Sequence, residues 1–317
     1  MLSQMGKLLS IGLPVFNGER YLAQALAGIR AQTLAEFEVV IADNGSTDHT
    51  GEIARAVVSA DSRFRYVRRE RNIGLVPNYN QVFAETDGEF FAWHAADDLT
   101  HPEFYRACVN LLRGHPDAAA ATSEILLMDP AGQVLGPDPE RIHADHPDPA
   151  VRFGELASFR HFAQFTYGVY RRSMMARTRL MLPFFWTSDR LFLAELALQG
   201  PLVRDPRHLF YVRQHGERVT LGNRASFYAG LASPQRGTTW RYSQELRRAI
   251  DHAGLPPTEQ ERVRQALRRW QVRHSPRLAR SAVSALVSAL VSALVSATLH
   301  RRAGTPGSPA GAAGRSG

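Results

Sequence analysis

Short apolar runs alternate with segments of helical periodicity between Leu8 and about Met128, and this alternation restricts the chain to an α/β fold. The runs at residues 8–13, 37–42, 64–67 and 90–95 predict buried strands. A helical segment lies between successive runs, which predicts a mostly parallel sheet with right-handed crossovers and flanking helices. At 317 residues, the chain is expected to form one main domain with additions.

Polar side chains stand where three of these predicted strands end. The clusters are Phe16-Asn17, Asp43-Asn44 and Asp97-Asp98. Ligands of open α/β sheets bind beyond the carboxyl ends of the strands, so we expect the clusters to meet at one site. Two adjacent carboxylates repel each other unless a cation, donor groups or water face them. We also expect Asn17 to cap the helix that follows it.

The net charge is +8 and the pI about 10.1, and arginine carries the positive charge because Lys7 is the only lysine. This balance favours anionic partners, which include nucleotide phosphates, nucleic acid and an acidic membrane surface. The single cysteine, Cys108, excludes an internal disulfide and fits a reducing compartment. Residues 1–6 lack the features of a secretory signal, so we expect a cytoplasmic protein.

The C-terminal part differs in composition from the rest of the chain. Residues 226–280 predict basic helices, and residues 281–297 repeat Ser-Ala-Leu-Val without a charged residue. This run is near the minimum length for a membrane span, but serine and alanine dilute its hydrophobicity. A helix at the inner face of the membrane or a low-complexity extension is therefore favoured over a span. Residues 305–317 are expected to be disordered.

Several motifs occur in the order found in a known family of enzymes. They are Ser10 to Asn17, Gln32-Thr33 with Glu38 to Asp48, Asn72-Ile73-Gly74 with Asn78, and Gly88 to Asp98. Together they resemble the inverting glycosyltransferases of family 2, which have the nucleotide-diphospho-sugar transferase fold called GT-A. The resemblance covers about the first 115 residues, and it implies a GT-A-type sheet with a helical C-terminal extension.

The resemblance also implies roles for individual residues in binding a nucleotide-sugar. Asp97 would face the ribose or the sugar, and Asp98 would coordinate Mg²⁺ or Mn²⁺, which bridges carboxylate and phosphate oxygens. The remaining donor-binding residues would be Asp43 and Asn44 at the base, Pro14 and Phe16 alongside them, and Arg71 at the diphosphate. The family often has two acids where this chain has Asp43-Asn44, so the preferred base stays open.

Two further residues match functional positions of the family. Asp189, at the start of a predicted helix after an aromatic segment, would be the catalytic base that takes the proton of the acceptor hydroxyl. The alternative is that Asp189 only caps this helix. His215 follows a predicted strand and would ligate the metal or bond a phosphate, although a structural histidine is equally compatible with the sequence.

These observations predict four segments and one function. The segments are 1–117 for the nucleotide-sugar, 118–225 for the acceptor and the base, 226–280 as a basic helical extension, and 281–317 as a low-complexity tail. The function is a metal-dependent, inverting transfer of sugar from a nucleotide diphosphate to a glycan or lipid-linked acceptor, with peripheral membrane contact through the C-terminal helices. The alternatives are a nucleotidyltransferase and a non-catalytic nucleotide- or nucleic-acid-binding protein. No nucleic-acid partner is expected, because acids accompany the arginines of residues 241–280.

Overall fold

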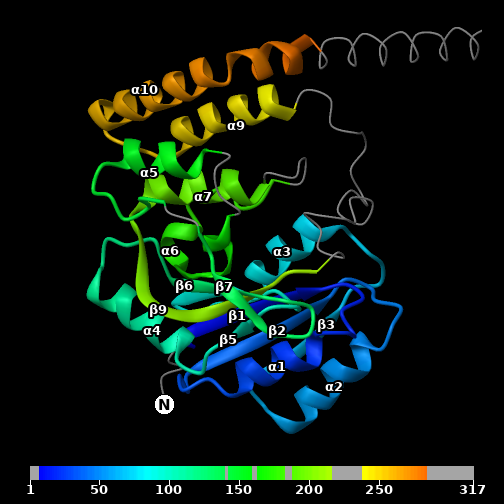
Figure 1. The fold of residues 1–317 in the computed structure, drawn as a ribbon. Coiled ribbons are helices and arrows are strands. Elements are labelled where there is room, and N and C mark those ends of the chain that lie inside the picture. Colours follow the sequence, from blue (N-terminus) through cyan, green and yellow to red (C-terminus); the bar gives the residue numbers. More distant parts are fainter. Residues whose placement is uncertain (1–6, 140–141, 159–162, 183–187, 216–237, 284–317) are drawn as a thin grey trace, which may run out of the picture.

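The computed structural model describes residues 7–139, 142–158, 163–182, 188–215 and 238–283, which form one sheet with helices on both faces (Figure 1). The strands are β1 (Leu9–Val15), β2 (Phe37–Asp43), β3 (Phe64–Arg68), β4 (Phe90–Trp93), β5 (Leu99–Thr100), β6 (Ala120–Met128), β7 (Val134–Pro137), β8 (Val169–Arg171) and β9 (Leu202–Arg213). Their order is β3-β2-β1-β4-β8-β6-β9-β5, and β7 pairs with β6.

The sheet has a parallel half and a mixed half. Strands β1 to β4 pair in parallel, as the sequence predicts. Strand β8 then runs antiparallel to both β4 and β6, while β6 and β9 are parallel to each other. The second half of the chain therefore extends the sheet of the first half instead of forming a separate one.

Helices connect the strands and cover the sheet. They are α1 (Leu22–Arg30), α2 (Thr50–Ala60), α3 (Leu75–Ala84), α4 (Phe104–Gly114), α5 (Pro149–Leu156), η1 (Gln164–Tyr167), α6 (Arg172–Met175), α7 (Ser188–Gln199), α9 (Thr238–His252) and α10 (Pro257–Arg273). Residues Leu9, Ile11 and Leu13 of β1 join the apolar cluster of α1 and α4, since alternate side chains of a strand share a face. On the other face, a Cβ at Gly12 would lie 2.7 Å from Val82 Cγ1, so glycine lets α3 pack closely on β1.

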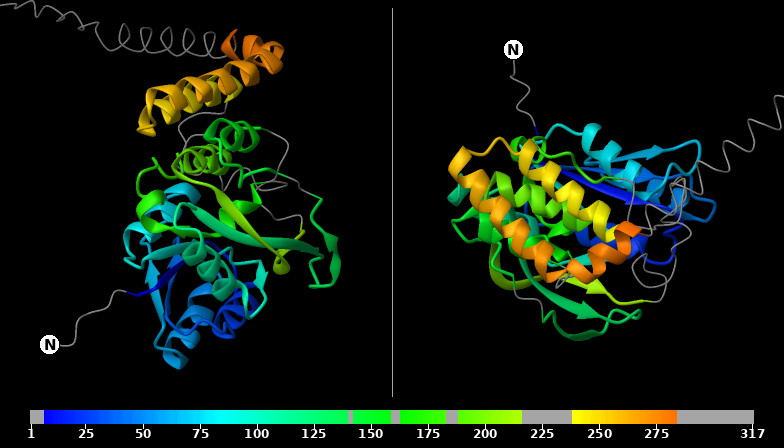
Figure 2. Two further views of the ribbon diagram at one scale, coloured as in Figure 1. Left: turned by 90° about the vertical axis from the view of Figure 1, so that its left-hand side faces the viewer. Right: turned by 90° about the horizontal axis from the view of Figure 1, so that it is seen from above.

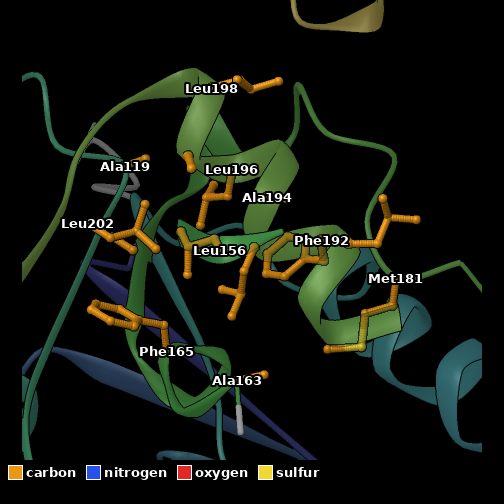
Figure 3. Packing of buried hydrophobic residues seen from close by; sticks show 14 of the residues in the cluster. Ala119, Leu156, Ala163, Phe165, Met181, Phe192, Ala194, Leu196, Leu198 and Leu202 are labelled. Atoms are coloured by element: carbon orange, nitrogen blue, oxygen red, sulfur yellow. The ribbon is translucent and has the colours of Figure 1, made fainter. Parts of the chain in front are cut away.

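Helix α7 is buried on all sides. No residue from Leu191 to Leu198 is more than 4% exposed, and Figure 3 shows Phe192, Ala194 and Leu196 among the side chains of this cluster. An amphipathic surface helix would expose one face, so a helix of this kind must have a layer above it as well as below. The layer above α7 is formed by α9 and α10, which lie side by side over α5 and α7 (Figure 2).

The predicted basic extension is helical, and its apolar face is part of the core. Leu246 and Ile250 of α9 and Val263 and Trp270 of α10 are buried in the same cluster as α7. The fold class is thereby confirmed: a sheet flanked by helices, with a helical C-terminal region. The division into four segments stays a prediction.

An ion-pair network attaches α7 to α9. The Nε of Arg179 donates to Glu195 Oε1 of α7 at 2.6 Å, and its Nη1 donates to Glu245 Oε2 of α9 at 2.6 Å. Both carboxylates are buried, at 3% and 7% exposure, and each therefore needs a charged or donating partner. Arg179 satisfies both, which fixes α7 relative to the C-terminal helices.

The described ranges contain no helix that is both long enough and apolar enough to cross a membrane. Most of the Ser-Ala-Leu-Val repeat, together with the tail predicted to be disordered, lies outside the described residues.

Candidate active site

The acid pair lies in the turn directly after β4, near the middle of the sheet. The N–H of His94 donates to the carbonyl oxygen of Gly12 at 2.9 Å, which extends the pairing with β1 by one residue. Asp98 is 2% exposed, whereas 31% of the Asp97 side chain is accessible to solvent. Asp98 is thus buried, and the side chain of Asp97 is partly exposed to solvent.

The end of β9 meets this turn. The N–H of Arg213 donates to Asp98 Oδ1 at 2.9 Å, and His215 Nε2 lies 2.8 Å from Asp97 Oδ2. The ring of His215 packs against Tyr21, with centroids 5.1 Å apart, and its buried Nδ1 has no hydrogen-bond partner among the described residues. Asp97, Asp98 and His215, which the sequence predicts as one site, therefore lie together.

Carboxylate oxygens and imidazole nitrogen are suitable ligands for Mn²⁺, and carboxylate oxygens also suit Mg²⁺. The residues at this turn therefore fit a divalent metal by their chemistry. In the structure, however, the Asp97 carboxylate and His215 Nε2 contact each other. No group of three or more His, Cys, Asp or Glu among the described residues has an arrangement that could hold a metal ion. Metal binding here stays a prediction.

A neutral histidine lies in the core next to the acid pair. His94 is fully buried, and its Nδ1 is 2.9 Å from the Tyr105 hydroxyl oxygen. Burial lowers the pKa of His94 to about 4, although the nearby Asp98 backbone and Asp97 charge oppose this shift. The imidazole is therefore uncharged near neutral pH and does not offset the charge of the acid pair.

Asp43 and Asn44 end β2, as predicted, and their polar atoms bind the protein itself. Asp43 is fully buried; its Oδ2 accepts from the Tyr66 hydroxyl at 2.5 Å, and its Oδ1 accepts from the Ser46 N–H at 2.8 Å. The side chain of Asn44 donates to Asn72 Oδ1 at 2.9 Å and accepts from the backbone at residue 73. These bonds hold the loop after β2 against residues 72–74, and contact of Asp43 and Asn44 with a base stays a prediction.

The loop after β1 is fixed to the loop after β2. Asn17 has a left-handed backbone with φ of 51°, and its side-chain oxygen accepts from the Thr47 N–H at 2.9 Å. The prediction that Asn17 caps the next helix is wrong, because α1 begins at Leu22 and Asn17 instead bridges two loops. Pro14 lies within β1, and Phe16, directly after this strand, is 38% exposed. Contact of Pro14 and Phe16 with the donor stays a prediction.

Arg71 is exposed and makes no hydrogen bond or ion pair with other described residues. Its backbone passes close to Gly45, which has φ of 78°; a Cβ at Gly45 would lie 2.9 Å from the carbonyl carbon of Arg71. Glycine is therefore required there both for its backbone conformation and for this close approach. Binding of the diphosphate by Arg71 stays a prediction.

Asp189 lies in the first turn of α7, where its Oδ1 accepts from the N–H of Arg190 at 2.7 Å. Burial raises the pKa of the Asp189 carboxyl, and the Arg190 charge and backbone hydrogen bonds only partly oppose this shift. A raised pKa suits a general base, because a weakly solvated carboxylate holds a proton more readily. A capping role at the helix N-terminus is compatible with the same position.

Tyr79 of α3 lies near all three acids. Burial raises the pKa of its phenol, and a hydrogen bond with Tyr167 opposes this shift. The charges of Asp97, Asp98 and Asp189 raise the pKa further, since each would repel a phenolate. Its ring packs against Trp93 with centroids 5.6 Å apart. The sequence predicts Tyr79 only as part of an apolar helix face. The hydroxyl group on that face is the one feature of the sequence that could have indicated a functional role. The fold brings the acid pair and Asp189 around this buried ring.

Known proteins resemble this chain in sequence and in fold. The model of the family described as "Glycosyl transferase family 2" matches residues 10–175. EpsH of Bacillus subtilis is 28% identical over 180 residues, which are 55% of this chain and 50% of EpsH. The glycosyltransferase GlyG of Streptococcus pneumoniae is 32% identical over 95 residues, 30% of this chain and 32% of GlyG. The chain thus spans half or less of the length of these curated relatives.

Two solved structures have the same fold. TarS of S. aureus, in complex with UDP-GlcNAc, has a TM-score of 0.61 at 18% identity, over 84% of this chain and 72% of that one. The mannosyltransferase PcManGT of Pyrobaculum calidifontis, in complex with GDP-Man and Mn²⁺, has a TM-score of 0.54 at 15% identity, over 94% of this chain and 81% of that one. The family match covers more than half of the chain and includes the turn with Asp97 and Asp98. This chain belongs to glycosyl transferase family 2.

Proposed function

We propose that the protein is a metal-dependent, inverting glycosyltransferase that uses a nucleotide-diphosphate sugar. The observation that carries this proposal is the position of two acidic centres around Tyr79: the Asp97-Asp98 turn, and Asp189 at the start of α7. A sugar transfer needs both, since one centre must hold the leaving diphosphate and the other must accept the proton of the attacking hydroxyl.

The proposed reaction is a direct displacement at the anomeric carbon. Asp189 takes the proton from the acceptor hydroxyl, whose oxygen attacks the face opposite the nucleotide and so inverts the configuration. Asp98 and His215 would hold Mg²⁺ or Mn²⁺, which would supply positive charge to the departing diphosphate, and Asp97 would face the ribose or the sugar. Arg71, whose side chain is exposed, would add a second positive charge. The UDP-GlcNAc and GDP-Man bound by the two structural neighbours support this donor class.

We expect one nucleoside diphosphate to stabilise the protein only when Mn²⁺ or Mg²⁺ is present. UDP, GDP, CDP and dTDP would each be tested by thermal shift with and without metal. A nucleotide concentration of 100 times the Kd is expected to raise the free energy of unfolding by about 2.7 kcal/mol. The matching sugar nucleotide is then offered with candidate glycan and lipid-linked acceptors. The proposal is supported if nucleoside diphosphate is released and the anomeric proton signal in NMR shows that the product has the anomeric configuration opposite to that of the donor. Pyrophosphate release instead identifies a nucleotidyltransferase, and no metal-dependent nucleotide binding refutes the proposal.

We also propose that the outer surface of α9 and α10 contacts an anionic membrane. Arginines at positions 241 and 247 of α9 and 269 and 273 of α10 are exposed, as is Arg277 just after α10, and Val272 is 75% exposed. Basic side chains near an anionic membrane each contribute about 1 kcal/mol to binding. This contact would bring a lipid-linked acceptor to the enzyme.

Reversal of one of these charges is expected to weaken the binding. Arg269→Glu should reduce co-sedimentation with phosphatidylserine-containing vesicles at least about five-fold, and added salt should reduce it further. The control is Arg113→Glu, which reverses an exposed arginine at the end of α4. Equal losses for both variants, or equal binding to neutral phosphatidylcholine vesicles, would exclude a membrane-binding surface on these helices.

A further inference from the structure

Arg213, the last residue of β9, holds both members of the acid pair although it is only 1% exposed. Its backbone N–H donates to the Asp98 carboxylate at 2.9 Å, and its Nε donates to the carbonyl oxygen of Asp97, also at 2.9 Å. The carboxylate of one acid and the backbone of the other are therefore fixed by a single residue. His215, two positions further along the chain, meets the Asp97 carboxylate.

The other side of the Arg213 guanidinium binds two distant segments. Its Nη1 donates to the carbonyl oxygen of Pro130, in the turn between β6 and β7, at 3.0 Å. Its Nη2 donates to Gln24 Oε1 of α1 at 2.9 Å, and its central carbon lies 4.5 Å from the ring centroid of Tyr21. A planar guanidinium can serve these directions at once, whereas a lysine ammonium cannot.

The charge of Arg213 has no carboxylate in ion-pair contact among the described residues. Its guanidinium donates only to neutral oxygens, so its hydrogen bonds are satisfied while no direct ion pair neutralises its charge. The nearby negative charges are those of Asp97 and Asp98, and the buried His94 is neutral. A permanent cation therefore lies beside the acid pair, at the place where the proposed donor would add the charge of a diphosphate.

We propose that Arg213 is a positioning residue of the active site. It holds the Asp97-Asp98 turn and the segment leading to His215 in one fixed geometry, and its charge offsets the repulsion between the two acids. This role rests on the proposed function, because the geometry matters only if the turn binds a metal and a diphosphate. Arg213 itself acts through the acids and not on the sugar.

The test compares Arg213→Met and Arg213→Lys with a matched control, Arg152→Met. Arg152 of α5 is also buried, at 5% exposure, and its guanidinium likewise donates to backbone oxygens, those of Ala197, His146 and Pro147. Both methionine variants remove a buried guanidinium, and both are expected to lower Tm. The two arginines differ in that Arg213 contacts the acid pair and Arg152 does not.

For Arg213→Met we expect the Kd of the nucleoside diphosphate with Mn²⁺, measured by calorimetry, to rise at least about 10-fold. We expect kcat to fall about 100-fold, because a small misplacement of the reacting groups can lower the rate by this much. The Mn²⁺ concentration for half-maximal activity should rise in parallel. Arg213→Lys should recover part of the nucleotide affinity, because it restores the charge, but little of kcat, because it lacks the planar fork. Arg152→Met should leave Kd, KM and kcat unchanged.

Two results would overturn the assignment by different routes. If wild-type protein binds none of UDP, GDP, CDP and dTDP with Mn²⁺, the proposed function fails and the role of Arg213 fails with it. If wild-type protein binds and turns over normally while Arg213→Met matches it, or while Arg152→Met loses as much, the proposed function stands and Arg213 is only structural.

Discussion

Replacing Asp98 with asparagine is expected to lower kcat by roughly 10³-fold, because the transition state loses the carboxylate that would hold the metal against the diphosphate. Asparagine has nearly the same shape, and its side-chain oxygen can still accept from the Arg213 N–H, as Asp98 Oδ1 does. The turn after β4 should therefore keep its geometry. Initial rates at saturating donor, with Mn²⁺ varied, would measure the effect, and the Mn²⁺ requirement should rise along with the loss of rate.

Asp205→Asn is the matched control for this change. Asp205 is also a buried aspartate of the sheet, at 8% exposure in β9, and it pairs with Arg207 at 2.8 Å. This substitution should lower stability without a change in kcat or in the Mn²⁺ requirement. A normal kcat in Asp98→Asn would remove Asp98 from the reaction and would leave the acid pair as a structural feature of the turn.

Replacing Asp189 with asparagine is expected to lower kcat by about 10²- to 10⁴-fold and to leave donor binding unchanged, because it removes a general base that acts only on the acceptor. Burial raises the pKa of this carboxyl, so the active, deprotonated form accumulates at higher pH than for an ordinary aspartate. In the wild-type enzyme, kcat/KM should therefore rise with pH through this raised pKa, and the variant should lose that dependence.

The same pKa shift predicts the effect of Asp189→Asn on stability. A carboxyl whose pKa is raised by folding stabilises the native state below the ordinary aspartate pKa of 3.8, and this contribution is lost as pH rises through the raised value. Near neutral pH the partly buried, charged carboxylate of Asp189 destabilises the fold. Asp189→Asn should accordingly have an equal or higher Tm than wild type near neutral pH, and this advantage should disappear at acidic pH.

If Asp189 only caps α7, kcat is not expected to fall, and a second capping aspartate provides a control for this alternative. Asp148 caps α5, where its side chain accepts from the Ala150 N–H at 2.8 Å. If Asp189 only caps α7, then Asp189→Asn and Asp148→Asn should both change Tm slightly, with kcat near the wild-type value. A large loss of kcat for Asp189→Asn alone would assign the base.

Helix α7 connects the C-terminal region to the proposed catalytic base. Asp189 begins this helix, Glu195 lies in its middle, and Arg179 connects Glu195 to Glu245 of α9. The charge of Asp189 also reaches Tyr242 of α9, where burial and then this charge raise the pKa of the phenol against the opposing effect of Arg190. The extension thus supports the helix that carries the proposed base.

The sequence alone determined the parts of the protein that depend on short stretches of chain. Apolar runs and helical periodicity predict β1 to β4 with their helices, because burial of one face leaves a local pattern. The polar cluster at the end of β4 predicts the acid pair Asp97-Asp98, and the family resemblance adds His215 to the same site, where its Nε2 meets the Asp97 carboxylate. The family of the chain could also be inferred from the sequence, because the family's motifs are short stretches within the first half of the chain.

Only the tertiary structure decided how distant segments meet. The contacts of Arg213 join residues 83 to 189 positions apart, and the antiparallel strand β8 joins the two halves of the sheet. Tyr79 and α9 acquire their places beside Asp189 in the same way. Such contacts leave no periodic signal, because they depend on which surfaces are stacked and not on the residues next to them in the chain. The acid pair could thus be found from the sequence, whereas the buried cation that holds it could be found only from the fold.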